Sequence, residues 1–253
     1  MVHGLEHFTK RLAAFREHYV IVGGVAGNLL MSGLGVSFRA TKDLDIVVFM
    51  KPDPAFLKNL ADYIKDGEFE NREKSAVVAQ YYRFNKPKNP EFPKQIELFS
   101  KKPEDLELFD EQHIIPLQKI EMGDQFSGIL LEDDYYDLIQ ANAIDGDHCK
   151  FISAVAQIPL KARAFNELRE RREGGHKVDG DDIRKHRNDI LLLSQALPAG
   201  ESLKISGLPL VHLRTYLDEM SGLVKDAGVL GFCRSQKIGS VEEALRIIEG
   251  FYF

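Results

Sequence analysis

The chain has 253 residues, of which 44% are hydrophobic and 28% are charged, and its formal net charge is −6. This composition is typical of a globular protein with a sizeable core, organised as one large domain or two modest ones. The acidic balance excludes a protein that coats nucleic acid with its whole surface, although a local basic groove is compatible with it.

The sequence also lacks the signals of a membrane or secreted protein. No apolar run reaches the roughly 18 residues of a membrane-spanning helix, and the charged N-terminus does not resemble a signal peptide. The two cysteines, Cys149 and Cys233, form neither a metal-ligand spacing nor a disulfide framework. These features predict a cytoplasmic protein with reduced thiols and no membrane partner.

Periodic patterns predict alternating helices and strands in the first part of the chain. The expected helices cover residues 5–17, 25–34 and 52–63. The expected strands cover residues 19–22, 44–50, 77–84, 95–99, 113–117 and 127–131. This alternation predicts an α/β (α+β) domain built around a mixed β-sheet.

Beyond about residue 155 the pattern becomes mainly helical. Helix-like periodicity covers residues 160–172, 181–193, 209–223 and 241–251. We therefore expect an α/β domain over residues 1–155 and a helical C-terminal domain over residues 156–253.

A glycine pair and two aspartates flank the first two expected strands. Gly23 and Gly24 follow the first strand, and Asp43 and Asp45 begin the second. Glycines after a strand, with an acidic residue about twenty positions on, are part of the dinucleotide-binding fingerprint. Here, however, the acids precede the apolar part of the strand instead of following it, and the glycine spacing departs from G-x-G-x-x-G. The pattern therefore argues against a bound dinucleotide.

Metal chemistry explains the same residues better. Side chains alternate along a strand, so Asp43 and Asp45 point to one face, with Cα atoms roughly 7 Å apart. Two such carboxylates can hold a hard cation such as Mg²⁺ together with substrate phosphates, and the cation removes their mutual repulsion. Gly23 and Gly24, at the start of a helix, would offer backbone N–H groups to those phosphates. For an Asp-x-Asp pair alone, a solvated strand end is the alternative interpretation.

Glu97 is the candidate for a third carboxylate, because it alternates with apolar neighbours in the strand expected over residues 95–99. If that strand lies beside the one with Asp43 and Asp45, Glu97 would bind the catalytic metal and help to deprotonate an attacking hydroxyl. Three carboxylates in this arrangement suit the two-metal logic of phosphoryl or nucleotidyl transfer.

The N-terminal motif resembles that of the DNA polymerase β-type nucleotidyltransferases, and more narrowly their AbiEii-like toxin branch. The matching residues are Gly23-Gly24-x-Ala26, Gly35, Arg39, Thr41 and Asp43-Leu44-Asp45. The resemblance implies a nucleotidyltransferase-type mixed β-sheet domain with helices, followed by a helical domain. It also implies Mg²⁺ or Mn²⁺ as cofactor and a nucleoside triphosphate as substrate. Arg39 would either reach the phosphates or brace the loop against an aspartate.

Two later segments, IPLKARAFNELRERREGG and DDIRKHRNDILLL, are similar to the C-terminal helices of the same family. By this match Lys161 would bind the triphosphate, and Asp189 would lie near the nucleotide or the attacking group. Lys185 and His186 are further candidates for that pocket. Without the resemblance, Lys161 is expected to be a solvent-facing helix residue, and Asp189 to pair with Lys185 one turn earlier.

The resemblance, which covers about residues 18–193, implies transfer of a nucleoside monophosphate with release of pyrophosphate. The acceptor would be a tRNA 3′ end or a protein, and the enzyme would be a toxin of a toxin–antitoxin or phage-defence system, controlled by a cognate antitoxin. A small-molecule (antibiotic-type) nucleotidyltransferase and a non-catalytic nucleotide-binding module are the alternatives. Residues 161–187 hold nine Lys or Arg against six Asp or Glu. They form either a basic surface for phosphates and an RNA end, or two solvated helices. Residues 194–253 carry no motif.

Overall fold

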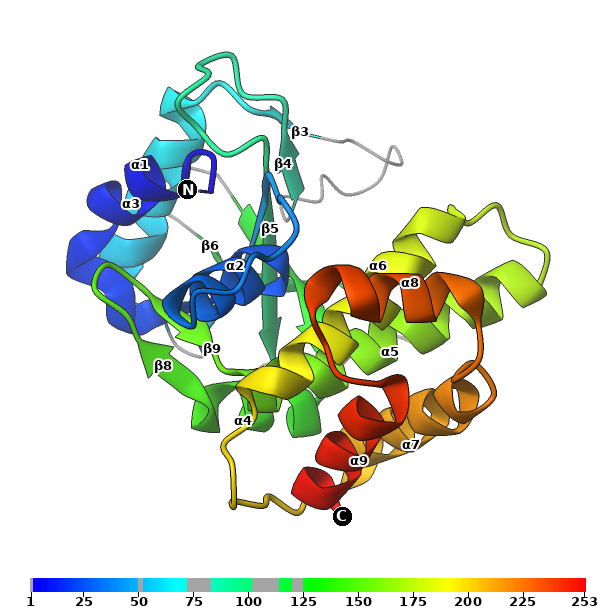
Figure 1. Ribbon diagram of the computed structural model, residues 1–253. Coiled ribbons are helices and arrows are strands. Elements are labelled where there is room, and N and C mark those ends of the chain that lie inside the picture. The colour runs from blue at the N-terminus through cyan, green and yellow to red at the C-terminus, as the bar shows by residue number, and fades with distance from the viewer. Residues whose placement is uncertain (1, 50–51, 72–82, 102–113, 120–124) are drawn as a thin grey trace. The chain divides into compact units, whose positions relative to one another are not determined.

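A computed structural model describes residues 2–49, 52–71, 83–101, 114–119 and 125–253 (Figure 1). The chain divides into two compact units. The first comprises Met1–Leu29 and Arg39–Ile152, and the second comprises Leu30–Phe38 and Ser153–Phe253. A short segment that lies early in the sequence therefore belongs to the second unit.

The first unit is built on a β-sheet that contains nine strands within the described residues. These strands are β1 (Tyr19–Val22), β2 (Asp43–Val48), β3 (Glu70–Asn71), β4 (Arg83–Asn85), β5 (Gln95–Lys101), β6 (Ile114–Lys119), β7 (Gln125–Leu131), β8 (Ala143–Asp145) and β9 (Lys150–Ile152). Their order is β3-β4-β5-β2-β1-β9-β8, and β7 pairs with β5 and β6. Strand β2 runs antiparallel to β1 and parallel to β5, so the predicted mixed sheet is confirmed.

The pairing register gives the sheet two different faces. On β2, Leu44 and Val48 are buried, whereas Asp43 and Asp45 are only half-buried. Tyr19 on β1 pairs with Val48, so its side chain shares the face of the buried residues. The sheet therefore has an apolar face and, at the start of β2, a polar face.

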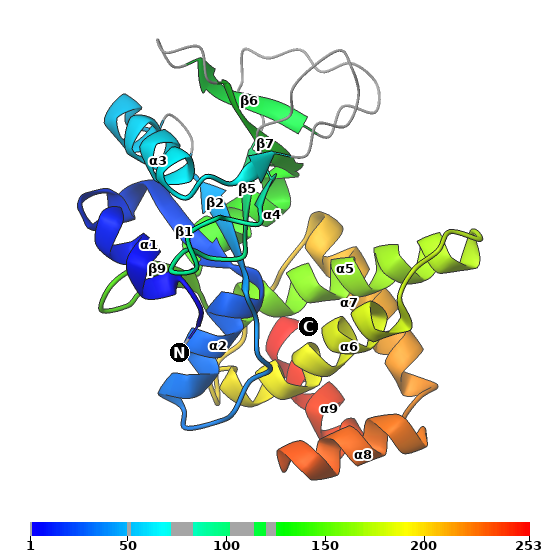
Figure 2. The same cartoon turned by 90° about the horizontal axis from the view of Figure 1, so that it is seen from above.

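Two helices of the first unit, α1 (Leu5–Arg11) and α3 (Pro54–Asp66), pack on the apolar face (Figure 2). The ring of Phe8 on α1 meets Tyr19 edge-on with 5.5 Å between the centroids. Phe56 on α3 stacks on the same ring at 5.8 Å. The polar face at the start of β2 is consequently the face opposite α1 and α3.

The remaining elements of this unit differ from the expected ones mainly in length. Helix α2 (Gly23–Gly33) follows β1 directly, and α4 (Asp133–Ala141) follows β7. The single helix expected over residues 5–17 is instead α1 and the 3₁₀ segment η1 (Ala13–His18), because the backbone kinks between them. Helix α4 and strands β8 and β9 were not predicted, since each is too short for a periodic pattern to stand out. Of the strand expected over residues 77–84, only the last two residues lie in the described part, and both belong to β4.

The second unit is helical, and the four helices predicted for it are present. They are α5 (Ala154–Glu173), α6 (Gly180–Leu193), α7 (Gly207–Ser221) and α9 (Val241–Tyr252). A further helix, α8 (Ala227–Gln236), was missed because its two glycines lower its helix propensity. Within the described residues, no helix is both long and apolar enough to cross a bilayer.

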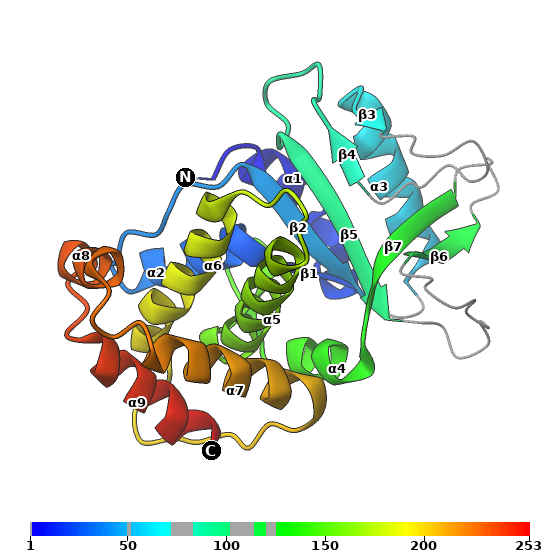
Figure 3. The same ribbon diagram turned by 90° about the vertical axis from the view of Figure 1, so that its right-hand side faces the viewer.

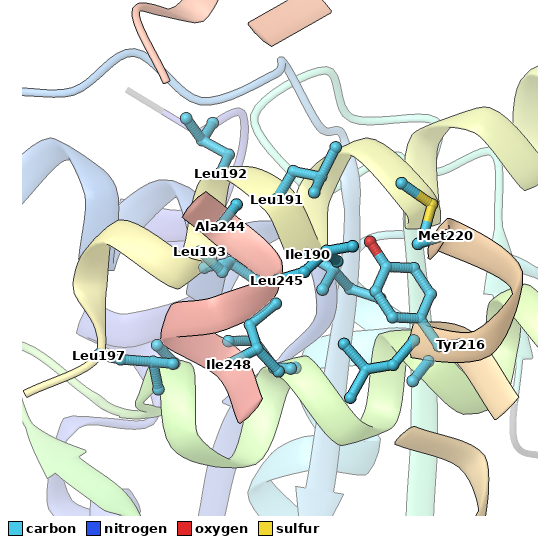
Figure 4. Close-up of a cluster of buried hydrophobic side chains, with 14 of the residues drawn as sticks. Ile190, Leu191, Leu192, Leu193, Leu197, Tyr216, Met220, Ala244, Leu245 and Ile248 are labelled. Carbon is cyan, nitrogen blue, oxygen red and sulfur yellow. The ribbon is translucent and has the colours of Figure 1, made fainter. Parts of the chain in front are cut away.

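One continuous apolar core holds this unit together (Figure 4). Ile190 on α6, Tyr216 on α7 and Ile248 on α9 are fully buried in it. The hydroxyl group of Tyr216 donates a hydrogen bond to the carbonyl of Arg187 at 3.1 Å, so the core satisfies its polar atom. Cys149 and Cys233 are both buried free thiols, as predicted.

Candidate active site

The parallel strands β2 and β5 lie side by side (Figure 3), and the first residues of these two strands include the three acids Asp43, Asp45 and Glu97. Asp45 lies directly opposite Glu97, and Asp43 lies opposite Gln95. Paired residues on neighbouring strands share a face at about 4.8 Å separation. The condition set for the role of Glu97, that its strand lies beside the strand of the two aspartates, is therefore met.

Gly23 brings the first turn of α2 against Asp45. The residue has a φ of +66°, in the left-handed region that favours glycine. A Cβ atom at this position would also collide with the Oδ2 atom of Asp45. Because Val22 pairs with Asp45, the register of β1 and β2 sets this close approach.

Gly24 makes a similar approach to the loop that precedes β2. A Cβ atom there would lie 2.8 Å from Thr41 Oγ1 and 3.3 Å from Arg39 Nη2. The loop thus returns to the start of α2 and places a guanidinium group beside it. A helix N-terminus and an arginine both favour anionic ligands, so this corner of the first unit suits phosphate groups.

Glu97 is the most constrained of the three carboxylates. Arg83 on β4 lies opposite it and forms an ion pair with its Oε1 atom. The side-chain amide of Gln95 donates a hydrogen bond to the same oxygen at 2.8 Å. Burial raises the pKa of Glu97, Arg83 partly offsets this increase, and the negative charge of Asp43 adds to it. The carboxylate is therefore harder to ionise than an ordinary glutamate.

A metal ion at this site would need ligands from a substrate in addition to those from the protein. Among the described residues, no three His, Cys, Asp or Glu side chains are grouped so that they could hold a metal ion. The ion pair with Arg83 keeps Glu97 engaged elsewhere. The two aspartates nevertheless fit Mg²⁺, which proteins commonly bind through one or two carboxylates and the phosphates of a substrate.

The second unit brings Lys161 and Asp189 together. Lys161 Nζ on α5 lies 2.8 Å from Asp189 Oδ2 on α6, and both side chains are only 6% exposed. The ammonium group also lies 5.8 Å from the centroid of the Phe38 ring. The expectation of a solvent-facing Lys161 was wrong. So was the expected pair between Asp189 and Lys185, because Lys185 instead contacts Asp182 at 2.7 Å.

Other basic residues of the stretch 161–187 are also paired with acids. These pairs are Arg163–Glu167, Arg169–Glu173, Arg169–Glu219 and Arg184–Asp181. Their carboxylates offset much of the positive charge of the two helices. The structure therefore favours solvated helices over a basic surface at this place.

No family model and no curated protein matches the chain. Among solved structures, the chain is similar to the antibiotic-resistance factor ANT(2'')-Ia, with 13% identity and a TM-score of 0.42. The alignment covers 87% of this chain and 92% of that one. The functional argument therefore rests on the geometry of the site itself.

We expect Gly23→Ala to destabilise the first unit by at least about 1–3 kcal/mol, because it forces a strained φ and a collision with Asp45. Gly33→Ala in the same helix is the matched control. A Cβ atom there meets nothing within 4 Å, so the change is expected to be neutral or to stabilise by up to about 1 kcal/mol. Urea unfolding measures both. Equal effects of the two substitutions would contradict the close approach of Asp45.

The pair of Lys161 and Asp189 gives a second prediction. Lys161→Met or Asp189→Leu alone is expected to cost about 3–5 kcal/mol of unfolding free energy, since each leaves a buried charge without its partner. The double variant is expected to recover most of that loss. A double-mutant cycle in urea measures the coupling, and additive losses would show that the two charges do not stabilise one another.

Proposed function

We propose that the protein is a metal-dependent nucleotidyltransferase, which transfers a nucleoside monophosphate from a nucleoside triphosphate to an acceptor and releases pyrophosphate. One observation carries the proposal. Asp43 and Asp45 share a sheet face, and Asp45 lies against the glycine turn at the start of α2. A pair of metal-binding carboxylates beside an anion-binding helix start is what a metal-bound triphosphate needs.

Residues of the first unit would bind the triphosphate and its metal ion. Backbone N–H groups at Gly23 and Gly24 would bind phosphate oxygens, and the guanidinium of Arg39 beside Gly24 would add a charged donor. Asp43 and Asp45 would hold Mg²⁺ or Mn²⁺. When bound, the metal would stabilise the charge on the attacking and leaving oxygens.

Glu97 would act as the proton acceptor. A hydroxyl of the acceptor attacks the α-phosphorus, a new P–O bond forms, and the bond to pyrophosphate breaks. The hydroxyl proton passes to the ionised carboxylate of Glu97, which Arg83 and Gln95 hold in position. Its raised pKa makes Glu97 a stronger base than an ordinary glutamate.

The roles of the second unit rest on the motif resemblance. Lys161 would bind the triphosphate, with Asp189 orienting its ammonium group, so phosphate oxygens would compete with Asp189 for the lysine. The same resemblance assigns Lys185 to the phosphates. Its pair with Asp182 is partly exposed and therefore weak, so a phosphate oxygen could replace the carboxylate.

The same resemblance supports a tRNA 3′ end or a protein as acceptor, and a toxin restrained by a cognate antitoxin. Modification of a small molecule of the antibiotic type is a second candidate for the acceptor. A non-catalytic nucleotide-binding module is the third candidate.

Asp43→Asn and Asp45→Asn are expected to reduce nucleotidyl transfer by at least about 100-fold, since each removes a charge from the metal site. Asp53→Asn is the control, because asparagine can keep the cap that Asp53 forms with the backbone N–H of Ala55. Labelled nucleoside triphosphates with total RNA or lysate measure the transfer. Full activity in both site variants would refute the site, and no transfer by the wild type with Mg²⁺ or Mn²⁺ would refute the reaction.

The pH dependence tests the proton acceptor. Glu97 works only when ionised, so kcat/KM is expected to fall as the pH falls through its raised pKa. Arg83→Gln removes an interaction that lowers this pKa, and the acid limb is therefore expected to move to higher pH. Arg83→Lys keeps the charge and is expected to shift the limb less. An acid limb that survives unchanged in Glu97→Gln would exclude this role.

A further inference from the structure

A cleft of about 460 Å³ opens in the first unit beside Asp43. It is lined by three lysines, Lys42, Lys86 and Lys94, by two acids, Asp43 and Glu70, and by Asn85 and Gln95. The function proposed above gives these lysines no role. Their chemistry, and their position next to a candidate metal ligand, indicate a second binding site.

The register of the sheet places the lysines in one row. Asp43 pairs with Gln95, and Gln95 pairs with Asn85, across β2, β5 and β4. Lys42 and Lys94 immediately precede β2 and β5, and Lys86 immediately follows β4, so the three lysines lie just beyond the ends of these strands. The backbone joins them, because Lys94 N donates to Lys42 O at 3.2 Å and Lys86 N donates to Lys94 O at 3.1 Å. The row is therefore held by these two backbone hydrogen bonds, although its side chains are exposed.

Two of these lysines are available to a ligand. Lys86 contacts Glu70 at 2.9 Å in an exposed pair of little strength. Among the described residues, neither Lys42 nor Lys94 has an ion-pair partner. The amide nitrogen of Asn85 is buried and finds no hydrogen-bond acceptor in the described part of the chain. Two ammonium groups and an amide donor around one cleft suit phosphate oxygens.

The order of the strands assigns these phosphates to the acceptor. The triphosphate is proposed to bind at Gly23 and Gly24, which lie on the β1 side of β2. The cleft lies on the other side of β2, toward β5 and β4. Attacking and leaving oxygens are roughly in line during phosphoryl transfer, so the acceptor approaches from the side opposite pyrophosphate.

We propose that this cleft binds the phosphate backbone of a single-stranded nucleic-acid acceptor close to its reacting end. The inference rests on the proposed nucleotidyl transfer and names its acceptor class. Glu70 is paired with Lys86, and Asp43 is assigned to the metal, so Lys42 and Lys94 leave the cleft with a net positive charge that would repel a polycationic aminoglycoside. A nucleic acid instead gains affinity from the counterions that its phosphates release at these lysines.

The test uses fluorescence anisotropy with a labelled single-stranded RNA of mixed sequence, about ten nucleotides long. The double variant Lys42→Gln/Lys94→Gln is expected to bind it roughly tenfold more weakly, with a log–log salt slope smaller by about 1.4. The control is Lys58→Gln/Lys65→Gln, which removes the same charge from two exposed lysines of α3 that do not line the cleft. The control is expected to bind like the wild type.

Two further measurements separate the possible outcomes. Binding of each nucleoside triphosphate with Mg²⁺, measured by calorimetry, is expected to be unchanged in the Lys42→Gln/Lys94→Gln variant. Weaker nucleotide binding with unchanged RNA binding would overturn the proposal and assign the cleft to the nucleotide. Transfer of label to an aminoglycoside or to protein, without binding of RNA, would also overturn it. The RNA-binding assay needs neither metal nor nucleotide. If the wild type binds RNA through Lys42 and Lys94 but transfers no label, the proposed nucleotidyl transfer is contradicted and the RNA-binding cleft is not.

Discussion

The close approach of Asp45 to the first turn of α2 is the constraint on which the rest of the site depends. It requires a residue without a side chain at Gly23, a left-handed backbone there, and the pairing of Val22 with Asp45. These conditions place the carboxylate of Asp45 beside the N-terminus of α2. A shift of either one would require a shift of the other. Because β5 pairs in register with β2, Glu97 joins them through backbone hydrogen bonds alone.

One face of the sheet contributes to the stability of the first unit, and the other carries the candidate functional residues. Aromatic rings of α1 and α3 bury one face, so that face can remain uniformly apolar. The opposite face is left for charged and polar groups, which are arranged by two registers of strand pairing that lie two residues apart. One register holds Asp45, Glu97 and Arg83, and the other holds Asp43, Gln95 and Asn85. A polar surface of this regularity follows from the two-residue repeat of a strand.

Periodicity predicted most of the fold, because long runs with a regular apolar repeat determine their own elements. It also predicted that Asp43 and Asp45 begin a strand and that Glu97 lies within another strand, but not that the two strands are neighbours. Periodicity could not predict which charged side chains pair with one another. Arg83 contacts Glu97 only because β4 pairs with β5, and Lys161 reaches Asp189 only because α5 packs on α6. The lysine row likewise exists only across three strands, so no local pattern in the chain could reveal it.

The early segment Leu30–Phe38 restricts how this protein can be dissected into pieces. It is grouped with the helical unit, and Met31 and Phe38 are buried members of that unit's core. A fragment that starts at Ser153 would therefore carry every helix from α5 onward and still lack part of its own interior. Its vacated positions would leave apolar surface open to water, which invites aggregation. A fragment designed for expression should therefore include every segment that contributes to the core of the helical unit, even where those segments are far apart in the sequence.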